Sequence, residues 1–113
     1  MNLSQIPQVI NNFITATNKP DADAYLDCFA EDAIVLDEGQ KRCGKAAIKI
    51  WSDENQFAVN VRLEPKQIKQ DSNEITITFK VAGDYDKSGL PDPLLLDFHF
   101  SIKDDKLIRL SIY

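Results

Sequence analysis

The chain has 113 residues, which supports one domain over residues 1–113 and leaves no room for a second. Its 18 acidic and 13 basic side chains give a formal net charge of -5, which argues against a nucleic-acid groove, because such a groove needs clustered Lys and Arg. No apolar run approaches the roughly 20 residues of a membrane span and the first residues lack the blocks of a secretion signal, so we expect a cytoplasmic protein without a membrane partner.

The first part of the chain has the periodicity of helices. Apolar residues at helical spacing predict a helix over residues 6–17, with Ser4 as a candidate N-cap and Pro20 just beyond its end. Asp21 is placed to cap a short second helix, which buries apolar side chains over residues 22–29. Both helices therefore come before any predicted strand.

A short strand and a third helix follow. Residues 33–37 predict a strand, and residues 38–40 predict the turn after it. Gly44 then precedes a third helix, in which Ala47 and Trp51 share one face.

From about Val59 the apolar period changes to two, which predicts strands for the remainder of the chain. Pro65 interrupts the first of these strands and predicts a bulge or bend. Clean alternation over residues 75–81 predicts a second strand. Residues 84–93, rich in Asp, Gly and Pro, predict a loop.

Two strands over residues 94–103 and 106–113 form the last predicted hairpin, with residues 104–105 as its two-residue turn. This turn pairs Lys103 with Lys106, and directly opposite residues share a face. One face then carries Leu96, Phe98, Phe100, Ile102, Leu107, Arg109, Ser111 and Tyr113. The other carries Asp97, His99, Ser101, Ile108, Leu110 and Ile112. Both faces are partly apolar, so we expect the helices to cover the first face and a second copy of the chain to cover the other.

The cysteines and the single histidine exclude several kinds of site. Cys28 and Cys43 lie far apart and form no CxxC, and His99 is the only histidine, so we expect no zinc cluster. Cys28 lies in an apolar run, which favours a buried, unreactive thiol. The glycines form no phosphate-binding loop, and we expect neither a metal nor a cofactor.

Four segments resemble the nuclear transport factor 2-like superfamily, and the resemblance covers nearly the whole chain. Residues 18–24 resemble its N-x-x-D-x-x-A helix junction, and residues 29–39 resemble its F-x-E-D-A-x-x-x-D strand. Residues 44–51 resemble its G-x-x-A-I-x-x-W third helix, and residues 97–100 resemble a strand of the SnoaL-like members. These motifs are specific for the fold and weak for the activity.

The resemblance implies an α+β fold in which a curved antiparallel sheet forms a cone around N-terminal helices, with an apolar pocket at the open end. Members are commonly dimers through the convex face of the sheet. In the register above, that face carries His99, Ile108, Leu110 and Ile112. The resemblance also implies a small hydrophobic ligand. It leaves two functions open: cofactor-free proton transfer of the isomerase, cyclase or dehydratase type, or ligand binding and dimeric assembly without catalysis.

Asp37 is the candidate catalytic residue. It ends the first predicted strand, where the similar ketosteroid isomerases place the aspartate that moves a proton between substrate carbons. The alternative is a turn residue, because Asp before Glu-Gly is ordinary hairpin chemistry. The oxyanion and supporting tyrosines of those isomerases align with Phe13, Phe29 and Ser52, and their protonated aspartate aligns with Phe98. The chain is therefore not expected to be a standard ketosteroid isomerase.

Further pocket residues are expected on the helices and on the inward face of the sheet. The candidate ligand-binding residues are Phe13, Trp51, Phe79, Phe98, Phe100, Arg109, Ser111 and Tyr113. Arg109 could bind a substrate carboxylate or enolate, or pair with Asp37; the alternative is a surface cation. A tryptophan at the helical spacing of Trp51 more often belongs to the core than to a ligand site, and Tyr113 could be frayed at the chain end.

Overall fold

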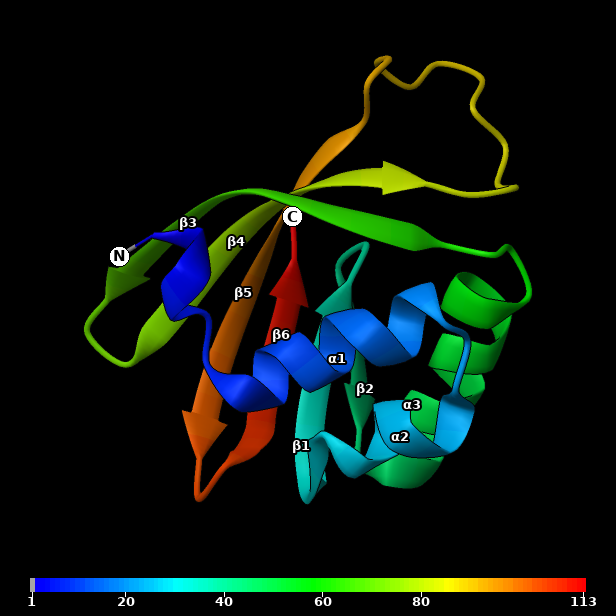
Figure 1. The fold of residues 1–113 in the computed structure, drawn as a ribbon. Helices are drawn as coiled ribbons and strands as arrows, with labels where there is room; N and C mark the ends of the chain where they lie inside the picture. Colours follow the sequence, from blue (N-terminus) through cyan, green and yellow to red (C-terminus); the bar gives the residue numbers. More distant parts are fainter. Residues whose placement is uncertain (1) are drawn as a thin grey trace.

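The computed structural model describes residues 2–113, which form helices packed on one six-stranded sheet (Figure 1). In chain order the elements are η1 (Leu3–Gln5), α1 (Gln8–Asn18), α2 (Ala22–Asp27), β1 (Phe29–Asp37), β2 (Gln40–Cys43), α3 (Lys45–Ser52), η2 (Asp53–Phe57), β3 (Arg62–Asp71), β4 (Glu74–Ala82), β5 (Leu95–Lys103) and β6 (Lys106–Ile112). The strand order is β2-β1-β6-β5-β4-β3. The predicted α+β class is confirmed. However, β1 runs parallel to β6, so the sheet is mixed and not wholly antiparallel as predicted.

The helix boundaries follow from local capping. The Asp21 side chain accepts a hydrogen bond from the backbone N–H of Ala24 at 3.1 Å, which confirms the predicted cap of α2. The predicted cap of α1 is wrong, because Ser4 lies inside η1 and its N–H donates to the side chain of Asn2. Pro7 takes the N-cap position of α1, where the lack of an N–H costs nothing.

Phe13 of α1 lies at the centre of the core. Its ring packs against those of Tyr25, Phe29, Phe98 and Phe100, with centroid distances of 4.9, 6.2, 6.3 and 5.4 Å. Tyr25 comes from α2, Phe29 from β1, and the last two from β5. This aromatic cluster joins the helices to the inner face of the sheet, across which α1 lies in Figure 1.

A bulge in β6 changes the predicted register of the last hairpin. Residues 104 and 105 have φ of 53 and 63°, as a two-residue hairpin turn requires, and Lys103 pairs with Lys106 as predicted. Ile102 then lies opposite Leu107, but Ser101 lies opposite Arg109. Ile108 is the extra residue, and every residue of β6 beyond it presents its side chain to the opposite face from the one predicted.

The shift corrects the placement of four residues. Leu110 and Ile112, expected on the convex face, lie on the inner face and are 0% and 8% exposed. Arg109 and Ser111, expected in the pocket, lie on the convex face with His99. The homodimer through the convex face stays a prediction. Of its expected residues, His99 lies on that face and Ile108 is the bulged residue. Ile34 and Leu36 of β1, which were not among the expected residues, are half-buried and also lie on the convex face.

Three other boundaries are informative. The predicted irregularity at Pro65 is confirmed, because the pairing of β3 with β4 shifts register between Pro65 and Gln67. β1 begins at Phe29, earlier than expected. The π-helical turn η2 extends α3, and no sequence pattern predicted it.

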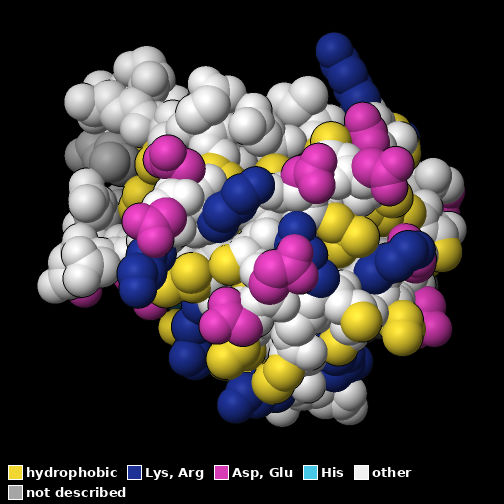
Figure 2. Space-filling model, turned by 90° about the horizontal axis from the view of Figure 1, so that it is seen from below, with side chains coloured by type: hydrophobic (Ala, Val, Ile, Leu, Met, Phe, Trp, Pro, Cys, Tyr) yellow, Lys and Arg dark blue, Asp and Glu magenta, His cyan; other side chains and the backbone are white. Residues whose placement is uncertain are grey.

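Within residues 2–113, no helix is long and apolar enough to cross a membrane. Seen from below, the molecule carries acidic and basic side chains interspersed with apolar ones (Figure 2). This face therefore lacks the clustered positive charge that attracts a phosphate backbone.

Candidate functional site

A cavity of about 510 Å³ opens where β1 and β6 end and β5 begins; we call it the Asp37 cavity. The ends of these three neighbouring strands lie together because Asp37 pairs with Ile112, and Ile112 pairs with Phe98. Residues from η2 and from the loop after β4 close the other sides. The apolar lining comprises Val59, Val61, Val81, Leu90, Leu94, Leu96, Phe98 and Ile112.

Asp37 is held in this cavity by a hydrogen bond from the helix behind it. The indole Nε1–H of Trp51 in α3 donates to Asp37 Oδ2 at 3.0 Å. Trp51 is 1% exposed, and a buried indole N–H needs such an acceptor. Asp37 is half-buried, and Glu38 and Gly39 turn the chain sharply after it with φ of 53 and 73°. The hairpin therefore ends β1 at the cavity and points one fixed carboxylate at it.

The candidate aromatic residues divide into two groups. Phe98 and Tyr113 line the Asp37 cavity. Four other candidates are buried in the core and do not line it: Phe13, Trp51, Phe79 and Phe100. The sequence pattern could not separate these groups, because a core ring and a pocket ring occupy the same inward face of a strand or helix.

The candidate polar residues of β6 do not reach the cavity. Arg109 and Ser111 lie on the convex face, where Arg109 Nε donates to Ser111 Oγ at 3.5 Å. An ion pair between Arg109 and Asp37 is therefore excluded by the register. Tyr113, just beyond β6, stacks on His99 of that face with ring centroids 4.0 Å apart.

Several cavity residues had no sequence signal. Gln56 in η2 is 8% exposed, and its Oε1 is buried without a hydrogen-bond partner. Tyr85 lies in the loop after β4, and its hydroxyl donates to the carbonyl oxygen of Val81 at 2.8 Å. A Cβ on Gly83 would lie 2.9 Å from the carbonyl oxygen of Val59, so this glycine lets the loop approach the chain after η2. Such long-range contacts between polar segments leave no periodic pattern.

The hydroxyl of Tyr25, near Asp37, is a second buried polar group without a hydrogen-bond partner in the described part of the chain. The side chain is wholly buried. Burial raises the pKa of Tyr25 well above its ordinary 10.0, and the charges of Cys28 and Asp37 raise it further. The hydroxyl therefore keeps its proton.

Tyr25→Phe should raise the free energy of unfolding by about 1–3 kcal/mol, because it removes a buried polar group that loses its water on folding and gains no partner. Urea unfolding of the two proteins measures the difference. The matched control is Tyr85→Phe, which removes a hydroxyl that does have a partner and should lower stability. A loss of stability in Tyr25→Phe would show that its hydroxyl is bonded in the folded protein.

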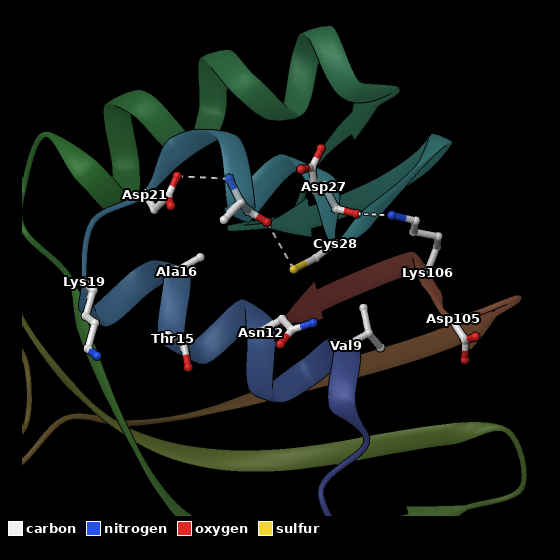
Figure 3. A pocket seen from close by; sticks show the side chains of 11 residues that line it. Val9, Asn12, Thr15, Ala16, Lys19, Asp21, Asp27, Cys28, Asp105 and Lys106 are labelled. Carbon is white, nitrogen blue, oxygen red and sulfur yellow. Dashed lines mark hydrogen bonds between the residues drawn. The ribbon is translucent and has the colours of Figure 1, made fainter.

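A second hollow of about 450 Å³ lies between α1, α2 and the turn that joins β5 to β6 (Figure 3). The thiol of Cys28 donates to the carbonyl oxygen of Ala24 at 3.4 Å, and Lys106 Nζ donates to the carbonyl oxygen of Asp27. Burial raises the pKa of Cys28 from 9.0 to about 11, although the charge of Lys106 lowers it. The thiol stays protonated at neutral pH, and the predicted burial of this cysteine is confirmed.

This thiol makes stability depend on alkaline pH. Its folded pKa is raised, so its contribution is fully present below pH 9.0 and is lost as the pH rises through about 11. Cys28→Ala should therefore flatten the fall in stability over this range, in denaturant unfolding at several pH values. Cys43→Ala removes an exposed thiol and should keep the wild-type slope. An unchanged slope in Cys28→Ala would contradict the assignment.

Neither a protein-family model nor a curated protein matches the sequence, but solved structures do. A candidate polyketide cyclase from Sinorhizobium meliloti, SMa1630, is 32% identical over 97% of each chain, with a TM-score of 0.87. A candidate polyketide cyclase from Pseudomonas putida KT2440 is 24% identical over 95% of this chain and 89% of that one, with a TM-score of 0.73. Delta 5-3-ketosteroid isomerase from Mycobacterium sp. is 18% identical over 94% and 89%, also with a TM-score of 0.73. The likeness to the ketosteroid isomerase shows a shared fold, and the likeness to the Sinorhizobium meliloti protein shows that the chain belongs to the nuclear transport factor 2-like superfamily.

Proposed function

We propose that this protein binds a small, mostly apolar molecule in the Asp37 cavity and moves a proton on it without a cofactor. The observation that carries the proposal is the position of the Asp37 carboxylate. It lies in a cavity whose lining is apolar for the larger part, and the Nε1–H of Trp51 donates to its Oδ2 at 3.0 Å. Among residues 2–113, no hydrogen bond engages Oδ1, so that oxygen can take up a proton.

The proposed step is an enolisation. Asp37 removes a proton from a carbon next to a substrate carbonyl, the electron pair of that C–H bond forms the enolate, and the protonated Asp37 returns the proton to another carbon. The outcome is an isomerisation, or a carbon nucleophile for ring closure. This chemistry agrees with the family to which the chain belongs.

The cavity offers few donors for the enolate oxygen. Phe13, Phe29 and Phe98 are hydrocarbon side chains at positions where the similar isomerases carry polar ones. Loss of one oxyanion donor typically costs about 2.7–4 kcal/mol of transition-state stabilisation. We therefore propose a substrate whose C–H bond is already acidic, such as a carbon between two carbonyl groups.

Binding without catalysis is the second candidate function, and the same lack of oxyanion donors favours it. In that case the cavity holds an apolar molecule and Asp37 only orients it. The two functions differ in whether the protein exchanges a substrate C–H proton with solvent.

The test uses a panel of small 1,3-dicarbonyl compounds and simple ketones in deuterated water. Proton NMR follows the loss of the C–H signal with and without the protein. Fluorescence of Trp51, the only tryptophan, reports binding beside Asp37. Saturable binding with accelerated exchange supports proton transfer, and saturable binding without exchange supports the binding module. If no compound shows either saturable binding or accelerated exchange, both candidate functions are overturned.

A further inference from the structure

The charges around the Asp37 cavity are of one sign. Four carboxylates line it: Asp37, Glu38, Glu54 and Asp86. In the described part of the chain, no Lys, Arg or His side chain contributes to this lining. The Ser88 backbone N–H donates to Asp86 Oδ1 at 2.9 Å and lowers the pKa of that carboxyl, so it is ionised at neutral pH. A negative ligand would therefore meet uncompensated repulsion here.

The same lining contains Gln56, whose side-chain oxygen accepts no hydrogen bond within the described residues. Gln56 is 8% exposed, and its Oε1 is buried. A buried carbonyl oxygen in this state has lost its water and gained nothing in exchange. A ligand that carries N–H groups would satisfy it.

The aromatic rim is also suited to a positive charge. Tyr85 lines the cavity, and its hydroxyl is fixed to the Val81 carbonyl oxygen. Lys87 Nζ lies 5.6 Å from the centroid of the Tyr85 ring, so this ring already attracts one ammonium group. Lys87 itself does not line the cavity.

We propose that the Asp37 cavity selects an organic cation, namely a protonated amine on a small apolar body. The ammonium group lies among the carboxylates and donates to Gln56 Oε1, while the apolar body packs on Leu96 and Phe98. A metal ion is a poorer match, because nowhere in residues 2–113 do three or more His, Cys, Asp or Glu side chains converge as ligands. The inference deepens the proposed function, since it concerns the ligand class of the same cavity.

The test compares three probes with the same ring: benzylammonium, benzyl alcohol and benzoate. Trp51 fluorescence and isothermal titration calorimetry give the dissociation constants. We expect benzylammonium to bind at least roughly tenfold more tightly than benzyl alcohol, and we expect its affinity to fall as salt is added. Benzoate should not bind. Benzyl alcohol or benzoate binding as tightly as benzylammonium would overturn the proposal.

Two variants locate the effect. Glu54→Gln and Asp86→Asn change exposed side chains, so both proteins should fold. Each substitution should lower the affinity for benzylammonium by about threefold. Asp32→Asn removes the same charge from an exposed position of β1 outside the cavity and should leave the affinity unchanged. If all three variants weakened benzylammonium binding equally, the preference would come from the net charge of the protein, and the proposed cation site would be wrong.

The probes separate this inference from the proposed function, because none of them has an enolisable C–H. If benzylammonium is preferred while no carbonyl compound exchanges, the cation site stands and proton transfer fails. If a carbonyl compound exchanges while benzylammonium shows no preference, proton transfer stands and the cation site fails.

Discussion

Phe13→Ala should lower the free energy of unfolding by about 3–5 kcal/mol, as expected for a large side chain truncated in the core. The Phe13 ring is wholly buried and lies within 6.3 Å of four other aromatic rings, centroid to centroid. Removing it leaves a cavity that helices and sheet enclose on all sides, and neither can collapse into it without moving the other. Since a domain of this size has a total stability of about 5–15 kcal/mol, the variant should be close to unfolding.

Guanidinium unfolding followed by circular dichroism measures this loss. The control is Ile50→Ala in α3. The Ile50 side chain is 61% exposed, so this substitution should change the free energy of unfolding by less than about 0.5 kcal/mol. The result also decides the role of Phe13, which the sequence suggested as a ligand contact. If Phe13→Ala changed ligand affinity and left stability intact, the ring would belong to the cavity and not to the core.

Asp37→Asn should slow substrate C–H exchange by about 10²- to 10⁴-fold, the contribution typical of a general base. Asparagine has the same shape and its side-chain oxygen can still accept the Trp51 Nε1–H, but an amide cannot take up the proton. The fold should therefore keep its stability while the rate collapses. The rate is measured by NMR on whichever dicarbonyl compound the wild-type protein exchanges fastest.

Asp32→Asn is the matched control for the rate, because Asp32 is an exposed carboxylate of the same strand. It should exchange at the wild-type rate. Two results would remove Asp37 from the mechanism: full exchange activity in Asp37→Asn, or a variant that no longer folds. The second would make Asp37 a structural partner of Trp51.

The position of Asp37 was predictable, because local signals determine it. The short apolar strand over residues 33–37, the Glu-Gly turn after it and the resemblance of residues 29–39 all place this carboxylate at a strand end. The capping of α2 by Asp21 and the hairpin turn at residues 104–105 were predictable for the same reason. Each depends on a few neighbouring residues whose backbone preferences agree.

The face of Arg109 was not predictable. Leu107, Ile108, Leu110 and Ile112 are apolar, so the pattern of β6 fits the inner face in either register. Only the packing of Leu110 and Ile112 against β5 decides between them. The π turn η2 was missed because a short polar stretch after a helix does not indicate where Gln56 will point.

The extra residue in β6 also marks where the length of this strand can change during evolution. Deleting the codon for Ile108 would remove the bulge and still leave Arg109 opposite Ser101 and Leu110 opposite Phe100, so the core face of β6 would be kept. A deletion further along β6 would instead turn every side chain beyond it to the other face of the sheet. Relatives of different length in this strand should therefore differ at the bulge, and should keep the alternation of the residues that follow it.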